Sequence, residues 1–224
     1  MKKILFVLLG LAIGSNGFAQ FSVSENQRYI LRAGKPFFYL ADTGWELFHR
    51  LDREQAAYYL KRRAEQGFTV IQAVVLAEFD GLHVPNAYGD LPLFNDNPAT
   101  PNEAYFRHVD YIIDKAAELN MVIALLPSWG DKVWRAQWGK GPEIFTVDNA
   151  LAYGKWIGDR YKNKHNIIWV VGGDRIPQNE THVEIWRSMA RGIVAGAGGV
   201  TKPLISFHPQ PNELGSAEWY HNDD

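Results

Sequence analysis

Residues 166–174 read NIIWVVGGD. The apolar run 167–171 has the length of an ordinary strand and is too short for most helices, and two glycines and a carboxylate end it. Uninterrupted apolar character is typical of a strand in a parallel sheet, because both faces of such a sheet are covered. The stretch therefore predicts a buried strand whose carboxyl end presents Asp174.

Similar apolar runs recur on both sides of this stretch. They lie at 37–41, 69–76, 121–126 and 203–207. The segments between them have apolar residues at spacings of three and four, which predicts helices. Each predicted helix has a start signal or an apolar stripe: Asp52 with Gln55, Thr100 before Pro101 and Glu103, Thr146, and the stripe Val183, Trp186, Ala190 and Ile193.

The alternation of strands and helices predicts an α/β fold in which helices cover a parallel sheet. Five strands could complete an open, doubly wound sheet, or they could begin a (β/α)8 barrel, which usually takes roughly 250 residues. Neither G-x-G-x-x-G nor G-x-x-x-x-G-K-[ST] follows any of the runs. Polar and aromatic residues instead follow the runs directly, where a barrel has its active site. The pattern favours a (β/α)8 TIM-barrel type with about the first five βα units present.

The composition excludes several kinds of protein. Lys and Arg number 23 against 25 for Asp and Glu, so no basic excess is available to bind nucleic acid. The absence of cysteine excludes a disulfide scaffold, a thiol nucleophile and a Cys-ligated metal. Glu78, Asp80 and His83 do not have the spacing of a recognised metal-ligand set. We expect no metal, no cofactor and no nucleic-acid partner, and the oligomeric state stays open.

Residues 1–19 have the features of a secretory signal. Lys2 and Lys3 precede the apolar stretch 4–13, and small residues follow it. The stretch is shorter than the roughly 20 residues that a membrane-spanning helix needs. We expect cleavage after this segment, export of residues 20–224 to a bacterial periplasm or the exterior, and no membrane attachment afterwards.

The residues that directly follow the predicted strands are candidates for a substrate site. Carboxylates there can transfer protons or act as nucleophiles, and indole faces stack on the C–H-rich rings of sugars. Asp174 is the candidate catalytic residue, because the two glycines before it allow close backbone approach at the end of a very apolar strand. The candidate substrate-binding residues are Asp42, Trp45, Glu78, Trp129, Asp131 and His208. The competing interpretations are a turn cap for Asp42, core aromatics for Trp45 and Trp129, a solvated acid for Glu78 and a satisfied hydrogen-bonding group for His208.

The stretch 166–174 resembles a segment of the apiosidase-like domain of glycoside hydrolase family 140. Residues 38–48, which read FYLADTGWELF, resemble another segment of that domain. Residues 218–224, which read EWYHNDD, resemble the start of a further motif. The resemblance covers about residues 21–224, and its motifs stand at predicted strand ends in the family's order.

The resemblance implies a (β/α)8 barrel, followed in many members by a smaller C-terminal β domain. It implies cleavage of a glycosidic bond in an oligosaccharide or polysaccharide, the characterised activity being removal of apiose from the pectic polysaccharide rhamnogalacturonan II. The family's proposed acid/base corresponds to Asp174. Its nucleophile is a Glu at the end of a later barrel strand, beyond residue 224, so no residue here is assigned that role.

Residues 20–224 would then be the N-terminal part of an incomplete catalytic domain, and we expect this polypeptide alone to be inactive. Two alternatives stay open. One is a carbohydrate-binding protein without catalysis on the same scaffold. The other is a barrel glycosidase of different linkage specificity, which the loops at 77–101 and 127–145 would determine.

Overall fold

A computed structural model describes residues 21–198 and 203–211, so the predicted signal segment and residues 218–224 lie outside the described residues. The main feature is a five-stranded parallel sheet in the order β4-β5-β6-β7-β8. Its strands are β4 (Ala41–Thr43), β5 (Val70–Leu76), β6 (Val122–Ser128), β7 (Ile167–Gly172) and β8 (Ile205–His208).

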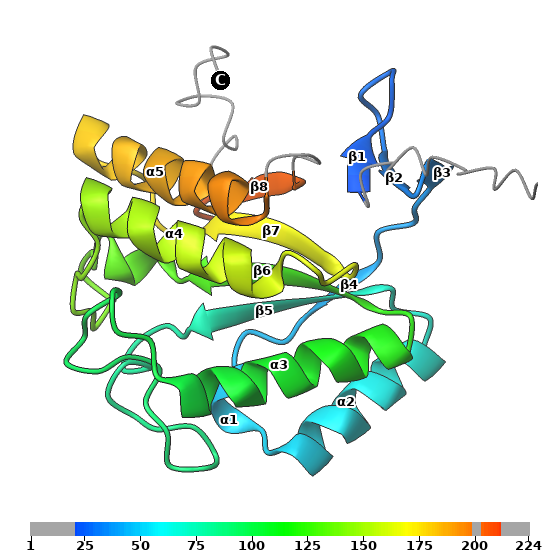
Figure 1. Cartoon of the computed structure of the whole chain (residues 1–224), viewed down its shortest axis with the longest axis horizontal. Coiled ribbons are helices and arrows are strands. Elements are labelled where there is room, and N and C mark those ends of the chain that lie inside the picture. The colour runs from blue at the N-terminus through cyan, green and yellow to red at the C-terminus, as the bar shows by residue number, and fades with distance from the viewer. Residues whose placement is uncertain (1–20, 199–202, 212–224) are drawn as a thin grey trace, which may run out of the picture.

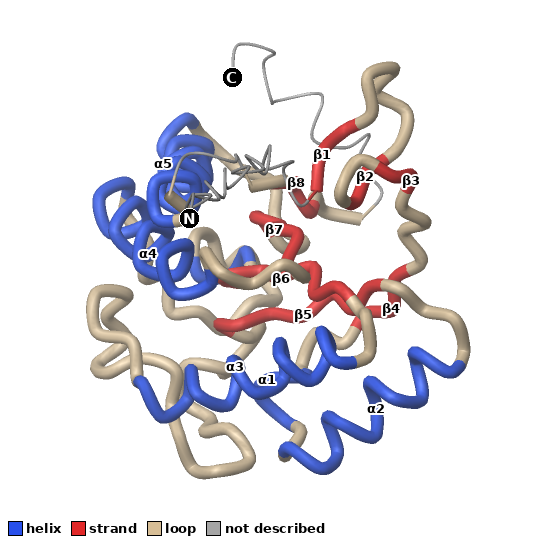
Figure 2. The backbone as a smooth tube through the Cα atoms, turned by 45° about the vertical axis from the view of Figure 1, so that its right-hand side comes forward, coloured by secondary structure: helices blue, strands red, loops and turns tan. Residues whose placement is uncertain are grey.

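The order of the strands distinguishes the two architectures that the sequence allows. A doubly wound sheet reverses its strand order at a switch point, whereas a barrel keeps sequence order. Here each parallel strand pairs with the next one along the chain. Figure 2 shows that the sheet curls and that the helices lie outside the curl. The prediction of a barrel-type α/β fold is therefore confirmed, with five parallel strands in the described ranges.

Four longer helices cover the outer face of the sheet (Figure 1). They are α2 (Arg53–Glu65), α3 (Glu103–Glu118), α4 (Val147–Tyr161) and α5 (Glu180–Gly196), beside the short α1 (Leu47–Arg50) and the 3-10 turn η1 (Gly130–Lys132). Asp52 and Thr146 cap α2 and α4 as predicted, each in a capping box. None of the helices in the described part is long and apolar enough to cross a membrane.

Both faces of the sheet are buried, as the uninterrupted apolar runs predict. In β5, Ile71, Ala73 and Val75 belong to the cluster that packs against the helices. Val70 and Val74 alternate with them and belong to a second cluster inside the curl. Successive side chains of a strand point to opposite faces, so the position along the strand decides which cluster a residue joins.

A small antiparallel sheet, which the sequence patterns do not predict, precedes the parallel one. It consists of β1 (Phe21–Val23), β2 (Ile30–Arg32) and β3 (Lys35–Pro36). Phe21 and Phe37 pack into the cluster inside the curl, and their rings lie edge to face at 5.7 Å. The small sheet therefore covers part of the inner face, at the end where the parallel strands begin (Figures 1 and 2).

The first parallel strand lies later in the chain than predicted. The expected strand was 37–41, whereas β4 begins at Ala41. The Thr69 hydroxyl donates to the Phe38 carbonyl oxygen at 2.6 Å and accepts from the Leu40 N–H at 3.0 Å. A side chain thus satisfies backbone groups that a ladder would otherwise pair, and this segment links the two sheets instead of belonging to one.

Two further predictions of element ends are wrong. Thr100 does not cap α3, because its hydroxyl donates to the Phe94 carbonyl oxygen, and the Asn102 side chain accepts from the Ala104 N–H instead. Pro127 does not end β6, which continues through the next residue. Pro127 follows Ile123 by four residues, so its missing N–H faces β7, and β6 pairs with β7 only as far as Leu125.

Glycines allow α4 and α5 to touch backbone to backbone. A Cβ at Gly154 would overlap the Met189 carbonyl oxygen, and one at Gly192 would overlap the Leu151 carbonyl oxygen. Gly158 and Gly196 make the same kind of contact one turn further along. Close packing of these helices holds α5 directly behind β7, the strand that leads to Asp174.

Candidate active site

Asp174 lies on a backbone turn that only a few residue types can adopt. Gly172, Gly173 and Asp174 have φ values of +98°, +129° and +52°, three consecutive residues in left-handed conformations. Glycine tolerates such values freely, and Asp is among the residues that adopt the last of them most readily. The N–H of Gly173 donates to the His208 carbonyl oxygen at 3.0 Å, which ties the turn to the neighbouring strand β8.

A hydrogen bond joins the side chains of Asp174 and His208. The His208 Nε2–H donates to Asp174 Oδ1 at 2.9 Å, because a carboxyl oxygen that carries no proton can only accept. Parallel register places Gly172 opposite His208, so adjacent strand ends bring the two residues together. The Asp174 side chain is 33% exposed, and its carboxylate is therefore both held in place and open to a ligand.

Two indole rings complete this group. The Trp45 and Trp129 ring centres are 5.1 Å apart, and each lies 5.4 Å from the His208 ring. Trp129 is buried and supports the other side chains of this group. Trp45 is only half-buried, so part of its indole surface can contact a ligand. Four of the residues predicted from separate strand ends, Asp174 included, thus lie together.

Close contact of two glycines places Trp129 beside the Asp174 turn. The Gly130 N–H donates to the Gly173 carbonyl oxygen at 3.2 Å. A Cβ at Gly173 would lie 2.8 Å from Gly130 N and 2.8 Å from the Trp129 ring, and one at Gly130 would overlap the Gly173 oxygen. No larger residue fits at either position without moving one strand end away from the other.

Glu78 belongs to an ion pair next to this group. Arg175 Nη2 donates to Glu78 Oε1 at 3.1 Å, and Arg175 Nη1 donates to the Asp174 carbonyl oxygen at 2.9 Å. Burial raises the pKa of Glu78, and the Arg175 guanidinium counteracts only part of that effect. Trp129 Nε1 also faces Glu78, although without a hydrogen bond of ordinary geometry. Because Arg175 binds only Oε1 of Glu78, the second carboxylate oxygen can accept a hydrogen bond from a ligand hydroxyl.

Asp131 has a different position from the one predicted. It is completely buried, so it cannot reach a substrate in this conformation. Its Oδ2 accepts from the Phe79 N–H at 3.1 Å, and its Oδ1 pairs with Lys132 Nζ at 2.8 Å. Lys132 Nζ in turn donates to the Phe79 carbonyl oxygen at 3.1 Å. Asp131 and Lys132 together hold the backbone of the loop after β5.

Asp42 also lies outside the cluster. It pairs in register with Ile71, a residue on the helix-facing side of the sheet. Its carboxylate accepts hydrogen bonds from the Tyr59 hydroxyl and from Arg63 Nε, both on α2. Partial burial raises the pKa of Asp42, but these two hydrogen bonds outweigh that effect and lower it. The predicted sugar-binding role does not fit a side chain that joins the sheet to a helix.

Sequence reasoning missed Arg175, which joins the Glu78 and Asp174 loops. The sequence places an arginine directly after Gly-Gly-Asp, at the end of a buried strand. A cation in such a position needs an anionic partner, which could have indicated the ion pair. The described residues contain no group of three His, Asp or Glu side chains placed to hold a metal ion.

A curled parallel sheet with a carboxylate, an imidazole and two indoles at its strand ends defines a barrel-type catalytic domain of the carbohydrate-active class. Residues 24–224 match the apiosidase-like catalytic domain, and the chain belongs to that family. No curated protein matches the chain.

Solved structures agree with this assignment. A glycoside hydrolase family 5 protein from Bacteroides vulgatus is 31% identical with a TM-score of 0.77, over 92% of this chain and 42% of that one. A second structure, titled glycoside hydrolase, is 32% identical with a TM-score of 0.71, over 86% and 41%. A family 5 mannosidase from Rhizomucor miehei shares the fold at 16% identity, with a TM-score of 0.61 over 88% and 57%. The chain spans about two-fifths of the length of the first two structures.

Proposed function

We propose that this protein is a glycoside hydrolase of apiosidase-like specificity, which acts on pectic glycans with Asp174 as general acid/base. The observation that carries the proposal is the Asp174 carboxylate, hydrogen-bonded to His208 beside two indoles at the end of the fourth parallel strand. The family assignment supports the same reaction class. The substrate-binding residues in this proposal are Trp45, Glu78 and His208.

The proposed reaction uses two carboxyl groups on opposite sides of the scissile bond. Asp174 protonates the leaving-group oxygen in the first step and takes a proton from water in the second. A Glu at a later barrel strand end, outside the described residues, attacks the anomeric carbon. A retaining mechanism requires a separation of about 5–5.5 Å between the two groups, and an inverting one about 6.5–9.5 Å. His208 keeps Asp174 oriented, since its Nε2–H holds one carboxylate oxygen.

Trp45 and Glu78 have complementary roles in the proposed binding of the sugar. Trp45 is half-buried and rests on Trp129, so its remaining surface can stack on the C–H face of a sugar ring. Glu78 is held at one oxygen by Arg175 and can accept a sugar hydroxyl at the other. Asp131 and Asp42 do not contact the sugar, because their carboxylates are engaged within the protein.

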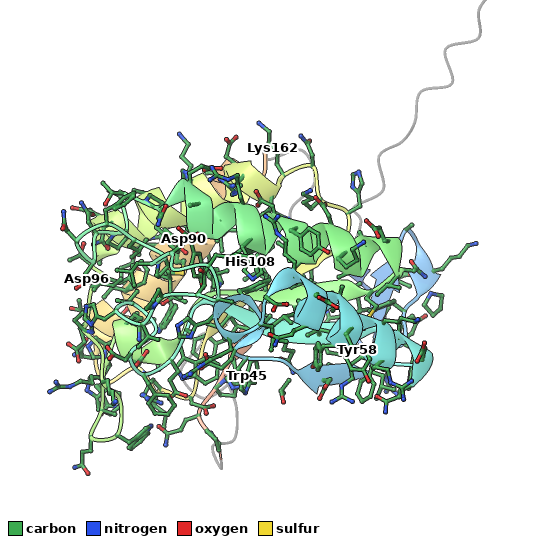
Figure 3. All side chains as sticks on the ribbon, turned by 90° about the horizontal axis from the view of Figure 1, so that it is seen from below. Trp45, Tyr58, Asp90, Asp96, His108 and Lys162 are labelled. Atoms are coloured by element: carbon green, nitrogen blue, oxygen red, sulfur yellow. The ribbon has the colours of Figure 1, made fainter. Side chains whose placement is uncertain are left out.

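The test compares leaving groups in the protein expressed from its complete reading frame. Asp174→Ala is expected to lower kcat/KM about 10²–10⁴-fold on rhamnogalacturonan II, whose leaving group needs protonation, and far less on p-nitrophenyl apioside. Asp90→Ala is the matched control, because Asp90 is a partly exposed carboxylate on the 77–101 loop (Figure 3), and the Asp174 carboxylate bonds to His208 rather than to Asp90. Equal losses on both substrates would remove Asp174 from the acid role. Binding of the polysaccharide without any hydrolysis would favour a carbohydrate-binding protein.

We further propose export, on the basis of residues 1–19. The basic start, short apolar stretch and small residues of that segment support secretion to a bacterial periplasm or the exterior. Fractionation of cells that express the complete reading frame tests this proposal, and a cytoplasmic protein with residues 1–19 still attached would contradict it.

A further inference from the structure

Two aromatic rings beside the Glu78–Arg175 ion pair are exposed to solvent. Phe79 follows Glu78 directly and is 46% exposed. Trp138 is 53% exposed, and the Arg175 guanidinium lies 4.9 Å from its ring centre. The mechanism above uses neither ring, and both belong to the long loops that follow β5 and β6.

Phe79 has a backbone conformation that is unfavourable for its residue type. Its φ is +55°, and a bulky residue in the left-handed region is a genuine outlier. Such conformations persist only where the surrounding structure holds them, and they cluster at ligand-binding and catalytic sites. The strain is not compensated by burial of the ring, because almost half of the residue stays in water.

A buried ion pair holds Phe79 in this conformation. Asp131 accepts from the Phe79 N–H, and Lys132 donates to the Phe79 carbonyl oxygen, so both backbone groups of this residue are bound. Asp131 and Lys132 are completely buried, and burying two charges costs free energy even when they pair. Burial lowers the pKa of Lys132, while Asp131 beside it acts in the opposite direction. The result of this arrangement is one exposed ring in a set position.

Trp138 is held through the catalytic loop. Arg175 is almost completely buried, and it binds Glu78, the Asp174 carbonyl oxygen and the face of Trp138. A cation against one ring face fixes that face and leaves other parts of the indole exposed. The positions of both rings are therefore tied to the same ion pair, and through it to the turn that carries Asp174.

We propose that Phe79 and Trp138 form an outer sugar-binding subsite, which stacks on rings of the polysaccharide next to the sugar that is cleaved. The inference rests on the proposed function, because it takes a glycan as the ligand. Asp131 and Lys132 are positioning residues in this account, since they act on the ligand only through Phe79. Trp45 serves the cleaved sugar, and the two exposed rings serve its neighbours.

The test measures binding by affinity electrophoresis in native gels that contain rhamnogalacturonan II, with the protein expressed from its complete reading frame. Phe79→Ala and Trp138→Ala are each expected to raise the dissociation constant for the polysaccharide about three- to tenfold, which is the range of a single aromatic contact. Tyr29→Ala is the matched control, because Tyr29 is also 46% exposed but lies beside β2, away from the strand ends. Tyr58→Ala, on the outer helix α2, is a second control (Figure 3).

A small substrate separates this inference from the proposed function. p-Nitrophenyl apioside has one sugar ring and cannot span both subsites, so each variant should lose far less activity on it than affinity for the polysaccharide. Unchanged polysaccharide binding in both variants would overturn the inference, as would a wild type that the gel does not retard. Hydrolysis of the small substrate in either of those cases would leave the proposed function standing.

Discussion

The loops after β6 and β7 lie side by side, and each presents an aspartate at the same end of the sheet. Asp131, after β6, is completely buried and binds the backbone of Phe79. Asp174, after β7, is one-third exposed and accepts a single hydrogen bond from His208. A carboxylate at a strand end is therefore available to a ligand only where the surrounding protein leaves one of its oxygens accessible.

Backbone geometry explains the difference between the two loops. The chain after β6 enters the 3-10 turn η1, which directs Asp131 and Lys132 under the neighbouring loop. The chain after β7 passes through two left-handed glycines before Asp174, and this places its carboxylate against the next strand end. Gly130 and Gly173 are in contact, so the two loops lie against each other. Their aspartates nevertheless have different partners, the Phe79 backbone for Asp131 and His208 for Asp174.

The largest effect on stability is expected at Asp131. Asp131→Ala leaves Lys132 as a buried charge without its partner and should lower the free energy of unfolding by about 3–5 kcal/mol. Asp174→Ala breaks only a partly exposed hydrogen bond and should cost less than about 1 kcal/mol. Urea unfolding of both variants measures the two losses in the free energy of unfolding. Equal losses would contradict the difference expected between Asp131 and Asp174.

A double variant sharpens the same contrast. Asp131→Leu combined with Lys132→Met removes both charges, so much of the lost stability should return. The Phe79 N–H would still lack its acceptor, and polysaccharide binding should stay weak although the protein is stable. Recovery of binding together with stability would show that Asp131 has only a structural role.

A smaller effect is expected at Asp42, which the sequence placed in the same site as Asp174. Asp42→Asn should leave kcat/KM on p-nitrophenyl apioside unchanged, because the carboxylate faces α2. The pKa of Asp42 is lowered in the folded state, so its contribution to stability is present at neutral pH and lost as pH falls through that pKa. Thermal melts should therefore show a less stable variant at pH 7 and no difference in acid. A loss of activity comparable to that of Asp174→Ala would contradict this placement.

The smallest effect concerns the loop after β5. His83 lies between Asp80 and Asp96, with ring nitrogens 3.1 Å and 2.9 Å from their carboxylates. The hydrogen bond to Asp96 is the largest cause of the raised pKa of His83; burial opposes it, and the hydrogen bond to Asp80 adds to it. A raised pKa stabilises the folded loop below the unfolded value of about 6.5, and this contribution disappears as pH rises through the folded value.

Limited proteolysis of residues 77–101 at a series of pH values measures this contribution. Cleavage of the wild-type loop should increase modestly above neutral pH, because the pair is half exposed and worth little. His83→Gln should be cleaved at a rate independent of pH. A wild-type loop with equal sensitivity at pH 5 and pH 9 would refute the role of His83.

Local signals in the sequence predict most of the elements. Asp52 with Gln55 and Thr146 begin helices as expected, because a capping box involves only residues within one turn. Thr100 was misleading, since its hydroxyl binds the carbonyl oxygen of Phe94 in a loop that the sequence did not describe. The small antiparallel sheet escaped prediction because its strands are only two or three residues long.

Amino-acid order alone was enough to establish a parallel sheet with helices outside it and a carboxylate at the end of NIIWVVGGD, because apolar runs, caps and glycines act over a few residues. Which carboxylates face a ligand depends on how distant segments pack in the folded chain. Asp42 differs from its neighbours by the face of the strand on which it lies, and Asp131 differs from Asp174 by the loops packed over it. Burial and partners come from segments far apart in the chain, and no local pattern records them.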